Sequence, residues 1–190
     1  MEHSKLRPQL VMCRADLSDL PQIQLPSEYT VRCYQDGDGP AWEQIIAASF
    51  ERQVQAGEFD RSMKRKRAFR PERVLFVLHG DEPVATASAW DSIGWGPATG
   101  QLHMVGVKPG HRGKRLGYWV SLAALHQFYT EGRPSAMLST DDFRLSAVKT
   151  YLFLDFVPVI IHENQRQRWA DVFLALSKPT LIQNSPSRSL

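Results

Sequence analysis

The sequence has few cysteines and no long hydrophobic run, and both absences exclude classes of protein. Cys13 and Cys33 are the only thiols, too few for a disulfide framework or a four-cysteine zinc site and too far apart for a typical redox pair. No apolar stretch approaches the roughly 20 residues of a membrane-spanning helix, and residues 1–10 lack the apolar segment of a secretory signal. We therefore expect a soluble cytoplasmic protein with no membrane partner.

The net charge of the chain is also small. The 23 lysines and arginines exceed the 20 acidic residues by only three, which does not by itself indicate a nucleic-acid partner. Hydrophobic residues make up 43% of the chain, which excludes wholesale disorder. At 190 residues we expect one domain. Its predicted organisation is an N-terminal extension with a possible edge strand (1–27), a domain (28–178) and a flexible tail (179–190).

Strand and helix patterns alternate along the chain. Apolar alternation and β-branched residues predict strands at 10–12, 29–34, 74–78, 83–90, 102–107, 136–139, 157–161 and 172–176. Helical spacing predicts helices at 40–50, 118–129 and 143–154, and a polar loop is expected at 162–170. Asp141 and Asp142 are predicted to cap the helix that follows them. The basic run 61–73 indicates a solvated helix.

The passage from Leu102 to Tyr129 carries the clearest chemical signal. A strand runs into a basic, glycine-containing turn (108–117) and then into a long apolar helix. Backbone N–H groups at the start of that helix, together with the nearby arginines and lysines, make an anion cradle suited to a diphosphate. A nucleoside-triphosphate P-loop would need Gly at position 108 and Ser or Thr at 115, and the dinucleotide fingerprint is missing. Neither of those cofactor classes is therefore expected.

The turn resembles the acetyl-CoA signature of the Gcn5-related N-acetyltransferase (GNAT) superfamily. The matching residues are Val105-Gly106-Val107-Lys108-Pro109 followed by Arg112-Gly113-Lys114-Arg115-Leu116-Gly117. A second family pattern, Ala-x-x-x-Tyr-x-x-x-x-Phe, is formed by Ala147, Tyr151 and Phe156. The resemblance covers roughly residues 28–177 and implies an α/β fold, the acyl-CoA N-acyltransferase fold. That fold has a mixed, mostly antiparallel central sheet of six to seven strands flanked by about four helices.

The resemblance also implies an activity. An acetyl group would pass from acetyl-CoA, with coenzyme A as product, to a primary amine that attacks directly in a ternary complex. Backbone groups of Met104, Val105 and Val107 would hold the pantetheine arm. The diphosphate would lie on the segment formed by Arg112, Gly113, Lys114, Arg115, Leu116 and Gly117. No metal is implied.

Tyr151 and His103 are the candidate catalytic residues. A phenol of pKa near ~10 can donate a proton to the departing thiolate, which makes Tyr151 the candidate acid; the alternative is a packed core aromatic. An imidazole of pKa near ~6.5 can take the proton of the amine, directly or through a water, which makes His103 the candidate base. The alternative for His103 is a structural histidine. Asp91 and Glu72 are fallback bases.

Three residues depart from the family pattern. Arg115 stands where the family has glycine, and its Cβ is acceptable only if the backbone keeps a negative φ or the ligand is displaced. Arg144, a candidate cofactor contact, stands where many relatives carry asparagine. Asp155 replaces a common glycine before Phe156, so that aspartate must serve the end of a helix.

The residues also allow two other functions. The chain could be a non-catalytic module that binds acyl-CoA as a regulatory ligand. The basic run 61–73 could instead bind nucleic acid, although only Phe69 offers a stacking aromatic there. The acceptor would be a small-molecule or peptide amine chosen by loops at 50–70, 91–100 and 162–170. The sequence leaves open the length of the acyl group and whether two copies form a homodimer.

Overall fold

The computed structural model of the protein describes residues 8–92 and 94–176. Its strands are β1 (Leu10–Arg14), β2 (Tyr29–Cys33), β3 (Val74–His79), β4 (Glu82–Asp91), β5 (Thr99–Val107), β6 (Ser135–Thr140) and β7 (Val157–Val159). Its α-helices are α1 (Gly39–Phe50), α2 (Leu116–Thr130), α3 (Leu145–Phe153) and α4 (Gln165–Ala175). The strand order β2-β3-β4-β5-β6-β1-β7 makes a seven-stranded sheet. The predicted fold class is confirmed.

The chain divides into two compact units. The larger unit comprises residues 15–136, and the smaller unit comprises residues 8–14 and 137–176 of the described chain. The predicted tail at 179–190 lies outside the described residues, as does the start of the predicted N-terminal extension. The predicted domain boundaries therefore stay predictions.

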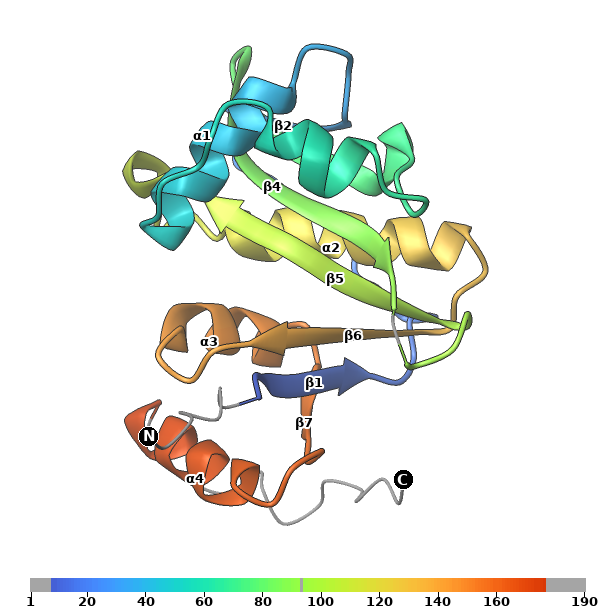
Figure 1. Ribbon diagram of the computed structural model, residues 1–190, viewed down its shortest axis with the longest axis vertical. Coiled ribbons are helices and arrows are strands. Elements are labelled where there is room, and N and C mark those ends of the chain that lie inside the picture. Colours follow the sequence, from blue (N-terminus) through green and yellow to red (C-terminus); the bar gives the residue numbers. More distant parts are fainter. Residues whose placement is uncertain (1–7, 93, 177–190) are drawn as a thin grey trace, which may run out of the picture. The chain divides into compact units, whose positions relative to one another are not determined.

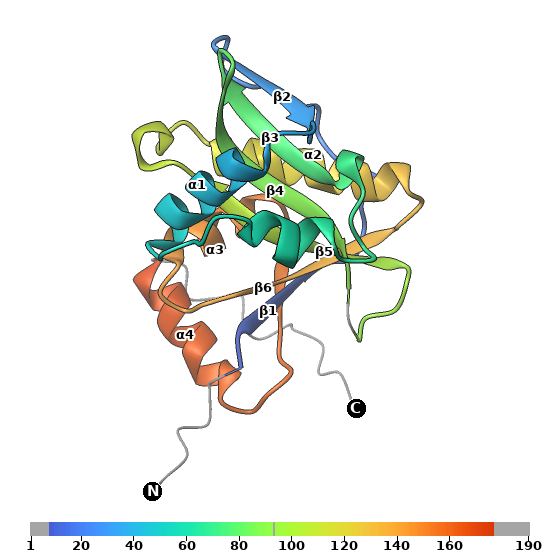
Figure 2. The ribbon, with the colours of Figure 1, turned by 45° about the horizontal axis from the view of Figure 1, so that its top comes forward.

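In the larger unit, four strands form an antiparallel ladder that is covered on both faces. β2 pairs with β3, β3 with β4 and β4 with β5. In Figures 1 and 2, α1 lies on one side of β4 and β5 and α2 on the other. Each helix approaches the sheet closely at a glycine: a Cβ at Gly106 would lie 3.2 Å from Ile45 of α1, and one at Gly100 would lie 2.3 Å from Phe128 of α2. These two glycines let the helices pack tightly.

The core beneath α1 is aromatic and aliphatic. Trp42, Ile45 and Ile46, which recur at helical spacing, are all fully buried, and Phe59 and Met63 join them from the segment after α1. That segment was predicted as a second helix, and this is wrong. It contains only a five-residue π-helical turn (Asp60–Lys64) and a 3₁₀ turn (Pro71–Arg73).

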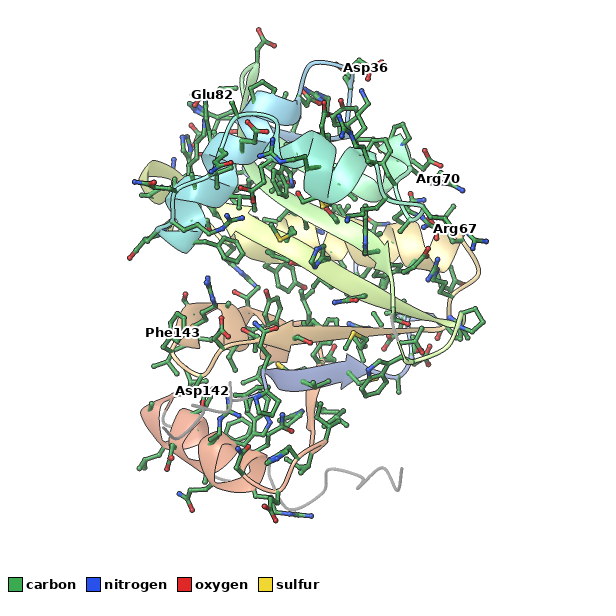
Figure 3. The ribbon with its side chains drawn as sticks, in the orientation of Figure 1. Asp36, Arg67, Arg70, Glu82, Asp142 and Phe143 are labelled. Carbon is green, nitrogen blue, oxygen red and sulfur yellow. The ribbon has the colours of Figure 1, made fainter. Side chains whose placement is uncertain are left out.

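The basic run is solvated over much of its length, and two of its cations are paired with carboxylates. The Nζ of Lys64 lies 3.1 Å from the Asp36 carboxylate. Arg67 and Arg70 extend away from the ribbon in Figure 3, and Arg70 donates to the carbonyl oxygen of Phe69 at 2.7 Å. Arg73, by contrast, is largely buried in ion pairs. Carboxylates therefore pair with Lys64 and Arg73 of this run.

In the smaller unit, β1 lies between β6 and β7 and pairs antiparallel with β7. It is an inner strand, so the expected edge position is wrong. The predicted strand at 172–176 and loop at 162–170 are also wrong, because helix α4 spans most of both. The buried residues of α4 recur at helical spacing: Gln165, Arg168, Trp169, Val172 and Phe173. Two polar members of this stripe hide the helical period when only apolar residues are counted.

Asp141 and Asp142 do not cap α3, contrary to the prediction. The helix begins after Arg144 with no side-chain hydrogen bond at its N-cap. The Asp141 carboxylate instead accepts hydrogen bonds from Gln9 and Arg144, each at 3.0 Å. Asp142, labelled in Figure 3, accepts from the Nε of Arg168 of α4 at 2.7 Å. Each carboxylate thus accepts from an arginine, and such charged hydrogen bonds are stronger than a bond to a neutral backbone amide.

Candidate functional site

Strand β5 is interrupted by a β-bulge near its middle. The register of β4 against β5 shifts between Thr86 and Ser88, so that the residue between them, Ala87, faces two residues of β5, Met104 and Val105. Met104 has a φ of +50°, which is uncommon for a residue with a side chain. Bulges bend a strand and re-aim its side chains, and they are frequent beside active sites.

The bulge brings the end of β5 against the last turn of α1. The N–H of Val107 donates to the hydroxyl of Ser49 at 3.3 Å, and a Cβ at Gly106 would lie 3.2 Å from the Ser49 side chain. The amide expected to hold pantetheine therefore has a partner within the protein. No local pattern assigns Ser49 a role at this site, because its position there depends on how α1 packs.

The turn after β5 ends at an uncapped helix. A 3₁₀ turn (Pro109–His111) is followed by Gly113, which has a φ of +81°, and by Arg115, the N-cap of α2, with a φ of +58°. The condition that Arg115 keep a negative φ is not met: an arginine occupies the left-handed conformation in which glycine is favoured. Its side chain makes no capping hydrogen bond.

The first helical hydrogen bond of α2 runs from the N–H of Trp119 to the carbonyl of Arg115, at 3.1 Å. The preceding amides, among them that of Gly117, have no acceptor inside the helix. They lie at the positive end of the helix dipole, where an anion is stabilised. These backbone groups fit a diphosphate.

The basic side chains of the turn differ in what they contact. Lys114 donates to the hydroxyl of Tyr29 at 2.8 Å, and this bond raises the pKa of its ammonium group. The Arg115 guanidinium lies 4.8 Å from the centre of the Tyr118 ring. The Arg112 guanidinium is exposed and has no partner among the described residues. Of the three basic side chains predicted to contact the diphosphate, Arg112 is the one that contacts no other described group.

His103 lies on β5 just before the bulge. Burial lowers the pKa of its imidazole, which is therefore neutral at neutral pH, as a base must be. Within residues 8–92 and 94–176 the ring has no hydrogen-bond partner; it lies 6.0 Å from the Trp90 ring. Ser88, the residue opposite His103 on β4, has a fully buried hydroxyl that also lacks a described partner. Buried polar groups of this kind are usually satisfied by water or a ligand.

Tyr151 and Phe156 belong to the end of helix α3. The N–H of Phe156 donates to the carbonyl of Tyr151 at 3.0 Å, and the N–H of Asp155 donates to that of Leu152 at 3.2 Å. Asp155 has a φ of +58°. These features form a Schellman motif with aspartate in the left-handed position, as the glycine-to-aspartate departure required. The ring contact between Tyr151 and Phe156, 6.2 Å between centres, is the hydrophobic contact of that motif.

The Tyr151 side chain is buried, and burial raises the pKa of its phenol to about 12 although the charge of Arg144 lowers it. The hydroxyl has no hydrogen-bond partner in the described part of the chain. Arg144 itself is held by Asp141 at 3.0 Å. The sequence did not single out Arg14 of β1, whose buried side chain donates to the carbonyl of Leu154 at 3.0 Å and so closes the same helix end.

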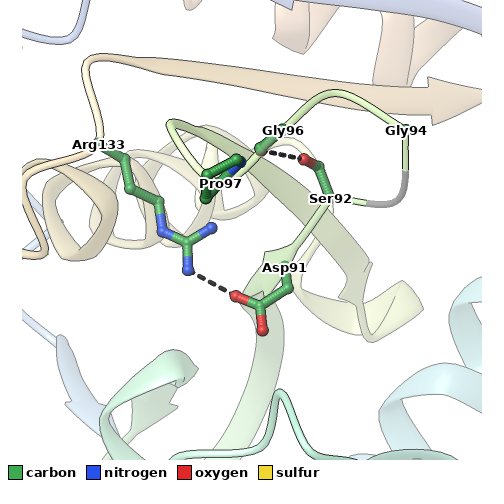
Figure 4. Close-up of a pocket in the computed structure, with 6 residues that line it drawn as sticks. All are labelled: Asp91, Ser92, Gly94, Gly96, Pro97 and Arg133. Atoms are coloured by element: carbon green, nitrogen blue, oxygen red, sulfur yellow. Dashed lines mark hydrogen bonds and ion pairs between the residues drawn. The ribbon is translucent and has the colours of Figure 1, made fainter.

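Asp91 lines a cavity of about 410 Å³ at the turn between β4 and β5. The residues around it are Asp91, Ser92, Gly94, Gly96, Pro97 and Arg133 (Figure 4). Burial alone would raise the pKa of the Asp91 carboxyl, but hydrogen bonds and charges from Arg133 and Arg73 outweigh it and hold the pKa below its usual value. Asp91 is therefore a poor base. Glu72, the other fallback, is exposed in the 3₁₀ turn before β3.

Among the described residues, no group of three or more histidines, cysteines or carboxylates is arranged to hold a metal ion. None of the helices in the described ranges combines the length and apolarity needed to cross a membrane.

Residues 39–156 match the acetyltransferase (GNAT) family. The chain belongs to this family. It is 30% identical over 154 residues to mycothiol acetyltransferase of Frankia alni, covering 74% of this chain and 46% of that protein. It is 29% identical over 164 residues to mycothiol acetyltransferase of a Nocardioides species, covering 77% and 56%. The chain thus spans about half the length of these curated relatives.

Solved structures show the same fold at lower identity. A GCN5-related N-acetyltransferase from Kribbella flavida aligns with a TM-score of 0.52 at 18% identity, covering 71% of this chain and 49% of that one. The ribosomal-protein-S18-alanine N-acetyltransferase of Escherichia coli aligns with a TM-score of 0.54 at 16% identity, covering 66% and 76%. The predicted resemblance to the GNAT superfamily is confirmed.

Proposed function

We propose that this GNAT chain is an N-acetyltransferase that moves the acetyl group of acetyl-CoA to a primary amine. The observation that carries the proposal is the uncapped first turn of α2, preceded by a turn with four lysines and arginines and no acidic residue: Lys108, Arg112, Lys114 and Arg115. Family membership and relatives named as acetyltransferases support the same activity and favour neither a regulatory module nor a nucleic-acid-binding role.

In this proposal the diphosphate binds at the β5–α2 junction, which comprises the turn 108–115 and the first turn of α2. The amides of the first turn of α2, including that of Gly117, donate to phosphate oxygens, and Arg112 adds a charged hydrogen bond. Backbone groups of Met104 and Val105 at the bulge hold the pantetheine arm. The Val107 amide would exchange its bond to Ser49 for one to the pantetheine, because an amide hydrogen serves one strong acceptor at a time.

The reaction requires a neutral amine and a protonated leaving group. Acetyl-CoA supplies the activated acetyl thioester. His103 takes the ammonium proton on a ring nitrogen, directly or through a water that also bonds to the Ser88 hydroxyl. Tyr151 donates its phenolic proton toward the departing sulfur. The pKa of about 12 keeps that proton in place throughout the neutral range.

The acceptor is a small-molecule or peptide amine. The curated relatives carry the name mycothiol acetyltransferase, so the acceptor of those enzymes is the first compound to test. In this proposal loops 50–70 and 91–100 select the acceptor, because surface loops are the segments that vary among proteins with one fold.

The test is mass spectrometry of reactions containing the purified protein, acetyl-CoA and a panel of amines. The panel comprises the mycothiol acetyltransferase acceptor, small polyamines, aminoglycosides and peptides with free amino groups. The expected result is one amine that gains the mass of an acetyl group, about 42 Da. Free coenzyme A thiol should be released in an equal amount. Binding of CoA with no acetylated product from any amine, and no thiol release above the protein-free control, would instead indicate a regulatory module.

A further inference from the structure

Four side chains that the proposed reaction does not use meet beside the β5–α2 junction. They are Tyr29 and His79, which face each other across the β2–β3 ladder, and His111 and Lys114 of the turn after β5. Tyr29 is 4% exposed. Its ring lies 5.1 Å from that of His79 and 5.9 Å from that of His111, and the two histidine rings are 5.3 Å apart.

Hydrogen bonds link three of these residues in a fixed direction. An ammonium group can only donate, so Lys114 donates to the Tyr29 oxygen, at 2.8 Å. The Tyr29 hydroxyl keeps its own hydrogen for the Nδ1 of His111, 3.0 Å away. That bond requires Nδ1 to be unprotonated. Burial, with the charges of His79 and Lys114, lowers the pKa of His111 and so favours the form that accepts.

The charged groups around these three hydrogen-bonded residues are also paired. Glu28 lies 3.7 Å from His79, and Glu82 lies 2.7 Å from the Nζ of Lys108 at the start of the turn. Glu82 is the one group facing His111 that raises its pKa, whereas Lys108 lowers it. Acidic residues therefore accompany the basic ones where the turn after β5 contacts β2 and β3.

The anchor is rigid on its sheet side. Tyr29 is the first residue of β2, its N–H donates to the Pro26 carbonyl at 2.9 Å, and its buried ring has little freedom to move. From this one phenol, contacts reach two turn residues, His111 and Lys114, that flank the positive-φ glycine Gly113. Arg112, whose side chain contacts no other described group, lies between them in the sequence.

We propose that Tyr29 is a positioning residue for the diphosphate site, which consists of the turn 108–115 and the first turn of α2. Tyr29 acts through Lys114 and His111 to hold that turn in its binding conformation. This inference rests on the proposed function. Lys114 then serves as an anchor of the turn, and the phosphate contacts fall to Arg112 and to the amides of α2. A turn held in advance loses less conformational entropy when the cofactor binds.

The test uses Tyr29→Phe, which keeps the ring and removes only the hydroxyl. Loss of the two hydrogen bonds should raise the Kd for CoA, measured by titration calorimetry, about three- to tenfold. The kcat at saturating acetyl-CoA should stay unchanged, because Tyr29 contacts no reacting group. The matched control is Tyr34→Phe, since Tyr34 is also buried and follows the same strand but bonds to Asp36, at 3.5 Å.

Two further measurements separate this role from simple stabilisation. In the free protein, backbone amides 110–115 should exchange hydrogen faster in Tyr29→Phe than in wild type, with no change in β3 or β4. Lys114→Met, a change on an exposed turn, should also raise the Kd for CoA. In the double variant with Tyr29→Phe, the Kd should rise by less than the product of the two single increases.

The outcomes distinguish the two proposals. Wild-type protein that does not bind CoA would overturn the proposed function, while the exchange experiment would still show whether Tyr29 orders the turn. If wild type binds CoA and Tyr29→Phe binds equally well, the positioning role is wrong whatever the exchange rates. Fully multiplicative effects of Tyr29→Phe and Lys114→Met would also contradict it.

Discussion

The two strand–turn–helix junctions, β5–α2 in the larger unit and β6–α3 in the smaller one, are alike in outline and opposite in charge. Each helix has an arginine as its N-cap, Arg115 or Arg144, and neither arginine makes a side-chain cap. Each first turn closes by the same bond to the arginine carbonyl, at 3.1 Å in α2 and 3.0 Å in α3. The backbones of the two N-cap residues differ, because Arg115 is left-handed with a φ of +58° whereas Arg144 has a φ of −83°.

The two turns also differ in how far their charges are neutralised. The β6–α3 turn carries Asp141 and Asp142, which pair with Arg144 and Arg168. The β5–α2 turn has no acidic residue, and the Arg112 guanidinium has no described partner. An uncapped helix start becomes an anion site only where the surrounding charge is left positive. Substitutions at the two junctions should therefore differ in their effect on CoA binding.

Gly117→Glu should weaken CoA binding by at least about 100-fold, because a carboxylate beside the diphosphate costs several kcal/mol. Gly117→Ala should bind nearly as wild type, since a Cβ there would lie 3.6 Å from Val107, an ordinary contact. Ser146→Glu places the same charge in the exposed first turn of α3 and is the matched control. Calorimetric titration with CoA measures all three. Equal losses in Gly117→Glu and Ser146→Glu would remove the distinction between the junctions.

Tyr151→Phe should lower kcat by about 100-fold and leave the Kd for CoA unchanged, because an acid catalyst acts in the transition state. With a pKa of about 12, the phenol stays protonated up to pH 10, so the ratio of wild-type to variant rates should be constant from pH 7 to pH 10. Tyr129→Phe, at an exposed position of α2, is the control. If the Kd rises while kcat is preserved, Tyr151 is a packing residue.

His103→Gln should reduce the rate by about 10- to 100-fold at pH 7, and the deficit should shrink toward pH 10 as the amine loses its proton unaided. Burial lowers the pKa of His103, so its neutral, basic form persists to lower pH than for a free histidine. The rise of the wild-type rate with pH that His103 causes should therefore lie below pH ~6.5. A deficit that persists undiminished at high pH would contradict a role confined to deprotonation.

Arg115→Gly should stabilise the protein by about 1 kcal/mol, because arginine pays for its positive φ and glycine does not. Asp155 has the same φ of +58° in the smaller unit, but aspartate tolerates this conformation better. Asp155→Gly also loses the contact with Arg14, 3.4 Å away, and should gain less. Urea unfolding compares the two variants. A larger gain at Asp155 would show that φ alone does not set the cost.

Elements whose buried face is mostly apolar could be predicted from the sequence. The β3–β4 hairpin and helix α2 bury only small polar residues, Thr86, Ser88 and Ser121, among their apolar ones and lie within two residues of the expected bounds. Helix α4 was missed because Gln165 and Arg168 occupy its buried face, where they are satisfied by hydrogen bonds to the carbonyls of Gln9 and Pro8. Those partners are more than 150 residues away in the sequence, so no local pattern reveals them.

For the candidate site, the sequence identified the chemistry but not the positioning. The basic turn and the helix start were found because both depend on neighbouring residues. The bulge at Met104 and Val105 was not, since it is a property of the β4–β5 register. Nor was Tyr29, which reaches Lys114 across 85 positions of sequence. Contacts between distant segments decide which of the predicted cations remain free to bind a ligand.

The most direct test of the central claim is a CoA titration followed by NMR of the backbone amides. If the β5–α2 junction binds the diphosphate, the NMR signals of amides 113–117 and of the Arg112 side chain should shift progressively as CoA is added and saturate together. The amide signals of the first turn of α3 should shift much less. Saturable binding whose shifts fall elsewhere and leave residues 112–117 unchanged would contradict the account.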